Sequence, residues 1–258
     1  MVSVLGVQWD TAWEDKAANH ANLAARLAAA PPAPDSLVVL PEMWATGFSM
    51  DVAAITETPA RETESFMAAL AEKHKVFLLG GVVTTGPGGL GRNEAVVFGP
   101  DGREAVRYAK MHPFSFGGET RHYGRGSSPT LWEWSGIKVA PFICYDLRFP
   151  EVFRAAARRG AELFCVLANW PSARAEHWTT LLKARAIENQ AFVLGVNRCG
   201  ADPKLSYMGR SLLLGPRGET LADGGAAEGV ISGSLDLPAL RAYRREFPAL
   251  GDVHPDYR

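Results

Sequence analysis

The chain has 258 residues, of which 47% are hydrophobic and 21% are charged, a composition that excludes disordered and collagen-like proteins and fits one globular domain. Its 27 Lys and Arg residues nearly balance 28 Asp and Glu residues and are interspersed with them, which argues against nucleic-acid binding. No apolar run approaches the ~18 residues of a membrane span, and no basic segment precedes the first apolar run, so we expect a soluble protein without a signal peptide.

Short runs of β-forming residues predict strands, and several of these runs are continuously apolar, as buried strands are. The predicted strands are Val2–Trp9, Leu37–Leu40, Val76–Val83, Glu94–Phe98, Ile137–Ile143, Leu163–Leu167, Phe192–Val196 and Ser211–Leu214. Helical patterns lie between them at Glu14–Ala30, Glu62–Lys75, Pro150–Arg159 and Glu176–Gln190. This alternation indicates an α/β fold, and hairpin-like turns at 98–103 and 214–219 indicate that the sheets are mixed.

The segment Gly86–Gly91 matches the G-x-G-x-x-G pattern of dinucleotide-binding proteins. In those proteins a helix follows the glycines and its N-terminus binds the pyrophosphate. Here residues 92–98 read as a strand, so we interpret the segment as a surface hairpin loop.

Polar side chains follow three of the predicted strands, at positions where ligands bind in open α/β sheets. Glu42 comes directly after Leu37–Pro41, Lys110 ends the strand that follows the turn at 101–102, and Cys144 ends the strand Ile137–Ile143. A helix begins near Pro150. A thiol at such a strand-to-helix junction meets outward-pointing N–H groups, which favour a thiolate and can hold an oxyanion.

The chain contains two further cysteines and six histidines. Cys165 lies inside an apolar strand and Cys199 follows another strand end, so we interpret both as structural. Three cysteines at these spacings fit neither a disulfide framework nor a zinc site, which indicates the reducing cytoplasm. The histidines show no metal-binding pair, but His112 and His177 lie near the other candidates, so a Cys-His couple stays open.

Three segments together carry a family resemblance. Pro41–Met43, Lys110–His112 and Cys144–Glu151 resemble the carbon-nitrogen hydrolase (nitrilase) family, which has a Glu-Lys-Cys triad in this chain order. The resemblance extends from Val4 to about Leu237.

A downstream block resembles the omega-amidase-like branch of that family. It comprises the loop Asn169–Arg174, then His177 and Trp178, and the segment Lys183–Gln190. The resemblance implies substrate contacts from Asn169, Trp170, Arg174 and His177. It also places Glu119 at the position of the family's second glutamate, although the residues around it differ from those of omega-amidases.

The mechanism that the resemblance implies is amide hydrolysis through a thioester. Glu42 acts as the base, Cys144 attacks the amide carbon, and the Lys110 ammonium with the backbone N–H of Tyr145 stabilises the oxyanion. No metal or organic cofactor is required. A glutamate of ordinary pKa, about 4.3, is a weak base toward a thiol of about 8.5, so we expect a dry pocket to raise the pKa of Glu42 and to activate the thiol.

The resemblance further implies a four-layer α-β-β-α sandwich with two mixed β-sheets. We expect residues 1–237 to form the hydrolase domain and residues 238–258 to form a C-terminal tail that packs on a partner subunit, in a homodimer or larger assembly. The expected partners are a small amide substrate and water, with no nucleic acid and no membrane.

The substrate expected from this resemblance is a small carboxylated amide, such as a 2-oxo acid with a terminal amide. A guanidinium grips a carboxylate well, which favours Arg174, with Arg121, Arg148 and Arg198 as the next candidates. Alternatives within the family are a nitrilase or an N-carbamoyl hydrolase. Two alternatives from other functional classes are a catalytically silent family member that acts as an interaction module, and a Cys-His thiol hydrolase on an unrelated α/β fold.

Overall fold

Two six-stranded mixed sheets form the centre of the computed structural model, which describes residues 2–254. The first sheet has the order β14-β1-β2-β3-β4-β5, with strands β1 (Val2–Gln8), β2 (Leu37–Val39), β3 (Phe77–Thr85), β4 (Gly91–Phe98), β5 (Glu104–Ala109) and β14 (Gly229–Leu235). The second has the order β13-β12-β9-β8-β7-β6, with strands β6 (Trp132–Trp134), β7 (Ile137–Ile143), β8 (Leu163–Ala168), β9 (Phe192–Asn197), β12 (Leu212–Leu214) and β13 (Thr220–Asp223).

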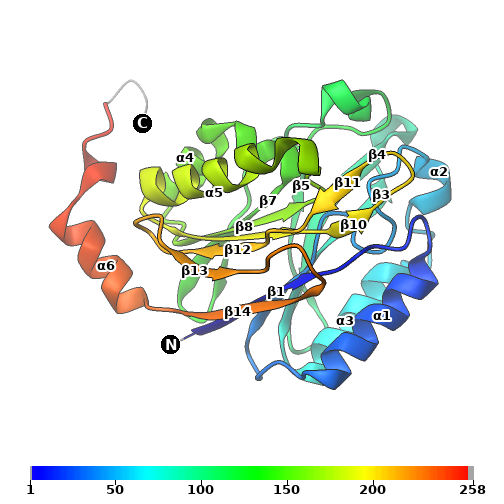
Figure 1. The fold of residues 1–258 in the computed structure, drawn as a ribbon, viewed down its shortest axis with the longest axis horizontal. Coiled ribbons are helices and arrows are strands. Elements are labelled where there is room, and N and C mark those ends of the chain that lie inside the picture. The colour runs from blue at the N-terminus through cyan, green and yellow to red at the C-terminus, as the bar shows by residue number, and fades with distance from the viewer. Residues whose placement is uncertain (1, 255–258) are drawn as a thin grey trace.

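Helices cover the outer face of each sheet, so the molecule has four layers (Figure 1). The helices are α1 (Lys16–Ala29), α2 (Val52–Ile55), α3 (Glu62–His74), α4 (Pro150–Arg158), α5 (Ala175–Asn189) and α6 (Leu237–Glu246). Figure 1 shows α1 and α3 on one side of the sheets and α4 and α5 on the other. The prediction of an α-β-β-α sandwich with two mixed sheets is therefore confirmed.

Alternation along the buried strands explains the layering. In β2, Val39 packs into the core between the two sheets, whereas Val38 packs into the core under α1 and α3. Leu79 and Leu78 of β3 divide in the same way. Because successive strand residues point to opposite faces, an apolar run without alternation belongs to a strand covered on both sides.

Local signals set the ends of the helices. Asp15 caps α1 by accepting a hydrogen bond from the Ala18 N–H at 2.9 Å, and α1 ends before Pro31. Pro150 occupies the first turn of α4, where its missing N–H costs nothing. Gln190 ends α5 in the left-handed region with a φ of 45°. The predicted helices all exist, and α6 is an additional helix that lies mostly within the predicted C-terminal tail at residues 238–258.

Both predicted hairpins are present. β4 pairs with β5 across the turn at residues 99–103, and β12 pairs with β13 across residues 215–219. Residues 86–90 form the loop between β3 and β4, which pair antiparallel, and Gly91 begins β4, so the predicted surface hairpin loop is confirmed. A third, two-stranded sheet pairs β10 (Cys199–Ala201) with β11 (Ser206–Met208).

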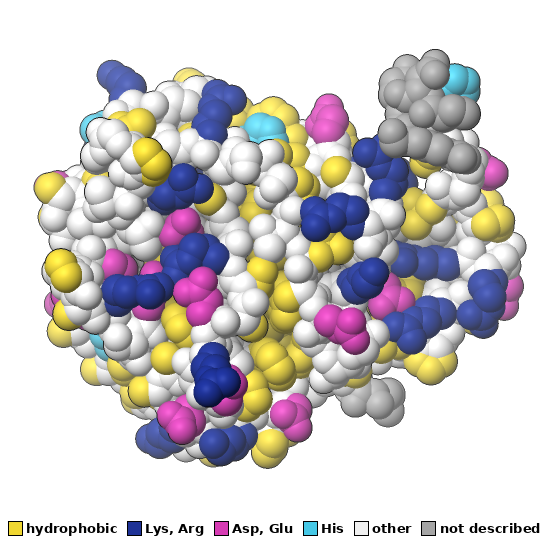
Figure 2. Space-filling model, turned by 180° about the vertical axis from the view of Figure 1, so that it is seen from behind, with side chains coloured by type: hydrophobic (Ala, Val, Ile, Leu, Met, Phe, Trp, Pro, Cys, Tyr) yellow, Lys and Arg dark blue, Asp and Glu magenta, His cyan; other side chains and the backbone are white. Residues whose placement is uncertain are grey.

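The surface carries no large patch of one charge on the face seen in Figure 2, where acidic and basic side chains lie side by side. Within residues 2–254, no helix has both the length and the apolar character that a bilayer crossing needs. The last four residues of the predicted tail, 255–258, lie outside the described residues.

Candidate active site

Three strand ends bring Glu42, Lys110 and Cys144 to one edge of the two sheets. Glu42 follows β2, Lys110 follows β5 and Cys144 follows β7. β2 is parallel to β3, and β5 lies two antiparallel pairings from β3, so β2 and β5 end at the same edge of the first sheet. The Lys110 Nζ lies 2.8 Å from Glu42 Oε1, which places the predicted acid and the predicted lysine in direct contact.

Glu119 completes a buried charge cluster around Lys110. It begins the short 3₁₀-helix Glu119–Arg121, and its Oε1 and Oε2 lie 3.0 and 2.9 Å from Lys110 Nζ. The side chains of Lys110, Glu42 and Glu119 are at most 1% exposed. The sequence analysis placed Glu119 in the site, and the structure brings it there.

Two asparagines hold the Glu42 carboxylate in place. Asn93, on β4, donates from Nδ2 to Glu42 Oε1 at 2.7 Å and to Glu119 Oε1 at 3.0 Å. Asn169, directly after β8, donates its backbone N–H to Glu42 Oε2 at 3.0 Å and its Nδ2 to the Glu42 backbone oxygen at 2.7 Å. The sequence analysis named Asn169 as a substrate contact and missed Asn93.

These contacts set the charges of the cluster. Burial raises the pKa of Glu42, but the charge of Lys110 and the hydrogen bonds from Lys110, Asn93 and Asn169 outweigh it, so this pKa lies below its usual value. The prediction that the pocket raises the pKa of Glu42 is therefore wrong. Burial lowers the pKa of Lys110, yet the Glu119 and Glu42 charges raise it overall. Burial is also the main reason that the pKa of Glu119 is raised.

Cys144 lies at the start of the 3₁₀-helix Cys144–Arg148 in a left-handed backbone conformation with a φ of 46°. Burial raises the pKa of its thiol, and the Glu42 charge raises it further. The prediction that the junction favours a thiolate is therefore wrong for the resting protein, because burial and the carboxylates outweigh the N–H groups. The group is a thiol that needs a base, and an ionised glutamate lies in the same cluster.

The turn at Cys144 carries backbone N–H groups beside the thiol. Tyr145 is the second residue of the 3₁₀-helix, and N–H groups in a first helical turn have no acceptor within the helix. The Cys144 Sγ lies 3.9 Å from the backbone oxygen of Asn169, so the thiol is next to the loop after β8. This geometry is compatible with a backbone oxyanion donor at Tyr145.

Asp146 links the turn at Cys144 to β5, the strand that precedes Lys110. Its fully buried carboxylate accepts from the Ile143 N–H at 3.0 Å and from the Tyr108 hydroxyl at 2.7 Å. It also accepts from the His112 N–H at 3.0 Å. Tyr108 lies on β5, two residues before Lys110, so one carboxylate links both sides of the site.

The two histidines that the sequence analysis kept open have other partners. His112 Nδ1 lies 2.8 Å from Asp146 Oδ1, and the exposed His177 accepts at Nδ1 from Arg148 at 3.1 Å. Within residues 2–254, neither ring is hydrogen-bonded to Cys144. The geometry therefore gives no Cys-His couple.

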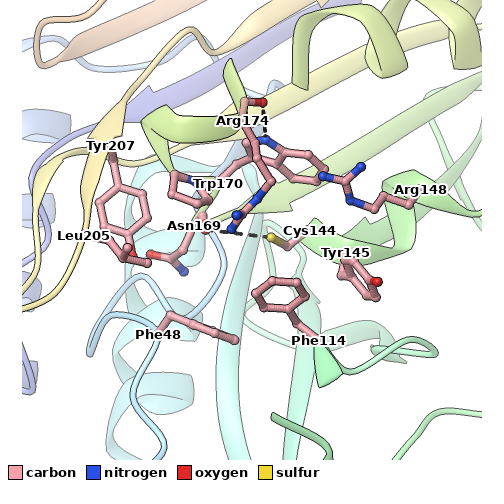
Figure 3. A pocket seen from close by; sticks show the side chains of 11 residues that line it. Phe48, Phe114, Cys144, Tyr145, Arg148, Asn169, Trp170, Arg174, Leu205 and Tyr207 are labelled. Atoms are coloured by element: carbon pink, nitrogen blue, oxygen red, sulfur yellow. Dashed lines mark hydrogen bonds between the residues drawn. The ribbon is translucent and has the colours of Figure 1, made fainter. Parts of the chain in front are cut away.

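An apolar pocket with two arginines opens beside Cys144 (Figure 3). The Arg174 guanidinium lies 5.4 Å from the centre of the Phe114 ring, and that of Arg148 lies 4.9 Å from the Trp170 ring. The lining residues are Phe48, Phe114, Cys144, Tyr145, Arg148, Asn169, Trp170, Pro171, Arg174, Leu205 and Tyr207. Three of the four predicted substrate contacts thus line the pocket, whereas His177 lies outside the lining and contacts it through Arg148.

Several lining residues carried no sequence signal. Leu205 and Tyr207 come from the β10–β11 hairpin and its turn, where the Asp202 carboxylate accepts from the Leu205 N–H and the Tyr207 hydroxyl. Phe48 follows Glu42 by six residues and lies 5.1 Å from Lys110 Nζ. Their positions depend on loops whose paths only the folded chain defines.

The other cysteines lie away from the cluster. Cys165 is fully buried inside β8, and burial raises the pKa of its thiol. Burial raises the pKa of Cys199, at the start of β10, to about 11. Within residues 2–254, no group of three His, Cys, Asp or Glu side chains is arranged to hold a metal ion.

Comparison with known proteins gives the family. The sequence model of the carbon-nitrogen hydrolase family matches residues 2–245. The chain is 41% identical over 221 residues to an omega-amidase of Yersinia enterocolitica, covering 84% of each protein. It is 34% identical over 221 residues to a 2-oxoglutaramate amidase of Bacillus subtilis, covering 85% of each.

A solved structure shows the same fold. The crystal structure of a carbon-nitrogen hydrolase superfamily protein from Xanthomonas campestris superposes with a TM-score of 0.91 at 35% sequence identity. The match covers 98% of this chain and 97% of that one. The four-layer arrangement described above is therefore the arrangement of an experimentally determined relative.

Proposed function

The chain belongs to the carbon-nitrogen hydrolase family, and from that premise we propose that it is an omega-amidase-type enzyme for short 2-oxo acids that carry a terminal amide. Its activity is the hydrolysis of a linear amide with release of ammonia.

Acylation begins with a proton transfer. Glu42 accepts the proton of the Cys144 thiol, and Sγ forms a bond to the amide carbon. The carbonyl oxygen becomes an oxyanion, which the Lys110 charge and the Tyr145 N–H stabilise. Glu42 then gives its proton to the amide nitrogen, the C–N bond breaks and ammonia leaves, so that a thioester remains on Cys144.

Deacylation uses the same groups in reverse. Glu42 takes a proton from water, and the hydroxide oxygen bonds to the thioester carbon. The second oxyanion collapses, the C–S bond breaks, and Glu42 returns the proton to Sγ. Lys110 stays charged throughout because the two glutamates raise its pKa, and Glu119 keeps it paired while Glu42 is protonated.

The charge of the pocket is the observation that supports the proposed substrate class. Two arginines, Arg148 and Arg174, line it, and no acidic residue does so among the lining residues of the described chain. A substrate carboxylate gains charge-assisted hydrogen bonds there, whereas a 2-ammonium group finds no counter-ion and loses its hydration. The pocket therefore favours a 2-oxo acid over the corresponding amino acid, in line with the names of the relatives.

A substrate panel with the purified protein tests this proposal. Ammonia release is measured for 2-oxoglutaramate, for glutamine, for an uncharged short amide, and for a nitrile and an N-carbamoyl compound of similar size. We expect the highest kcat/KM for 2-oxoglutaramate, because it alone combines the amide with a carboxylate and no ammonium. A higher kcat/KM for the nitrile or the N-carbamoyl compound would replace the omega-amidase assignment, and equal values for the uncharged amide would remove the role of the arginines.

We also propose a homodimer or larger assembly in the cytoplasm, with a hydrolase domain at residues 1–237 and a tail at 238–258. Ile187 on α5 and Phe247 after α6 are 51% and 58% exposed, and Gln190 Nε2 donates to the Phe247 backbone oxygen at 2.8 Å, so the two apolar side chains lie in one region. The three free thiols suit a reducing compartment. Light scattering during gel filtration tests the assembly, and a mass of one subunit would contradict it.

A further inference from the structure

Asn93 is the neutral member of the buried charge cluster. Its side chain is 1% exposed on β4, and its Nδ2 lies 2.7 Å from Glu42 Oε1 and 3.0 Å from Glu119 Oε1. The same two oxygens accept from Lys110 Nζ at 2.8 and 3.0 Å. One charged donor and one uncharged donor therefore bridge the two carboxylates.

The charges in this cluster do not balance. Two ionised carboxylates and one ammonium leave one net negative charge in a buried site. Two carboxylates that share such a site retain a proton between them unless hydrogen-bond donors stabilise both ionised forms. Asn93 supplies two such donors without adding a charge, and Nδ2 cannot accept a proton from either acid.

The other uncharged donors around the pair each reach one acid: the Asn169 N–H donates to Glu42 Oε2 at 3.0 Å, and the Phe114 N–H donates to Glu119 Oε2. Lys110 already faces both acids, and Cys144 faces them as a neutral thiol. The Tyr123 phenol also lies within their field, but its hydroxyl donates to the Ser49 backbone oxygen at 2.6 Å. Among the described residues, Lys110 and Asn93 are the two side chains that donate to both Glu42 and Glu119.

We propose that Asn93 is a positioning residue whose amide keeps Glu42 and Glu119 ionised side by side, so that Glu42 can accept the Cys144 proton at neutral pH. This inference rests on the proposed role of Glu42 as the base. Without the amide, the pair of acids binds a proton at higher pH, and Glu42 is free to accept the Cys144 proton in a smaller fraction of the molecules.

The sign of the expected pH effect follows from the contacts. Hydrogen bonds from Asn93 lower the pKa of Glu42 and oppose the effect of burial on Glu119. Their loss raises the pH at which the base ionises. Activity then falls at neutral pH and returns as the pH rises, which a purely structural defect does not produce.

The test uses Asn93→Leu, which has a similar size and no amide. We expect the acidic limb of kcat/KM to move to higher pH by about one unit, so that activity below the limb falls about tenfold and recovers at alkaline pH. Asn19→Leu is the matched control, because Asn19 is a buried asparagine that bonds only backbone groups near α1, including the Ala12 and Ala45 oxygens. We expect Asn19→Leu to lower stability and to leave the acidic limb of kcat/KM unchanged. A pH-independent loss in Asn93→Leu, or an unchanged profile, would overturn the inference.

A second measurement separates this inference from the proposed function. The rate of Cys144 alkylation by iodoacetamide needs the same proton transfer and no 2-oxo acid, so its acidic limb is compared between the wild type and Asn93→Leu. If the wild type releases no ammonia from 2-oxoglutaramate but the alkylation limb moves, the substrate class is wrong and the role of Asn93 stands. If Asn93→Leu does not fold, Asn93→Asp is used instead. A third carboxylate is expected to move the acidic limbs of kcat/KM and of the alkylation rate to higher pH. Unchanged acidic limbs in Asn93→Asp would refute the role of Asn93.

Discussion

Gly81 lies against the backbone of Glu42, the proposed base. Adding one methyl group at Gly81 tests how strongly turnover depends on the position of that backbone. Gly81 is on β3, and its N–H donates to the Pro41 oxygen at 3.3 Å. A Cβ at this position would lie 2.4 Å from Met43 N and 2.8 Å from Glu42 Cα. Ordinary van der Waals contact begins at 3.4 Å, so Gly81→Ala must displace the peptide that joins Glu42 to Met43, by about 1 Å at Met43 N and about 0.6 Å at Glu42 Cα. A misplacement of about 1 Å costs on the order of 100-fold in turnover.

Amidase kcat and the melting temperature are measured together on Gly81→Ala. We expect a folded protein destabilised by about 1–3 kcal/mol, as for other overpacked cores, with kcat reduced about 100-fold. Gly229→Ala is the control, because a Cβ at Gly229 meets nothing within 4 Å and leaves both values unchanged. A normal kcat in Gly81→Ala would show that the position of the Glu42 backbone does not limit the reaction.

Three further experiments test the assigned roles. Iodoacetamide inactivates the enzyme by labelling Cys144 first, and mass spectrometry of the labelled peptide checks this; retained activity in Cys144→Ala together with its loss in Cys165→Ala would reverse the assignment. Lys110→Met is expected to fold, which circular dichroism checks, and to lose about 100- to 1000-fold in kcat because an oxyanion stabiliser is removed. Near-normal turnover in Lys110→Met would exclude a role for Lys110 in stabilising the oxyanion. Arg174→Ala is expected to lose about 100-fold, or about 2.7 kcal/mol, in kcat/KM for carboxylated amides and little for uncharged ones; equal losses on both contradict carboxylate binding.

The sequence predicted the parts of the fold that rest on continuous apolar runs and on turn residues. Ile137–Ile143 is a strand with the predicted bounds, and its residues are apolar and buried except for the exposed Lys138, as expected for a strand covered on both faces. By contrast, β14 was missed: its sequence contains two glycines and two serines in Gly229–Leu235. It forms because every residue of Gly229–Leu235 pairs antiparallel with a residue of β1, which lies at the other end of the sequence.

The C-terminal helix was missed although a local signal exists. Asp236 caps α6 by accepting from the Ala239 N–H, and a proline follows in the first turn, a common pattern at helix starts. Leu237 and Leu240 are buried, and Arg241 pairs with Glu162 at 2.7 Å. The segment therefore packs on the second sheet's side of the molecule, a contact that composition alone does not reveal.

In the site, the sequence predicted which residues meet and missed how they are charged. Glu42, Lys110 and Glu119 were identified from motifs and lie in direct contact. Asn93 lies inside an ordinary strand pattern, 51 residues from Glu42 and 26 from Glu119, so no local spacing marks it. The pKa of Glu42 depends on the sum of burial and these distant donors, a balance that only the folded arrangement defines.

The left-handed backbone at the nucleophile has a consequence for how such a chain changes over generations. A side chain in that conformation costs about 1–2 kcal/mol, whereas glycine adopts it without that strain. Cys144 therefore sits where stability and chemistry favour different residues, and one nucleotide change in a cysteine codon yields glycine. Cys144→Gly would therefore relieve the strain of this turn and, in the same step, remove the proposed nucleophile.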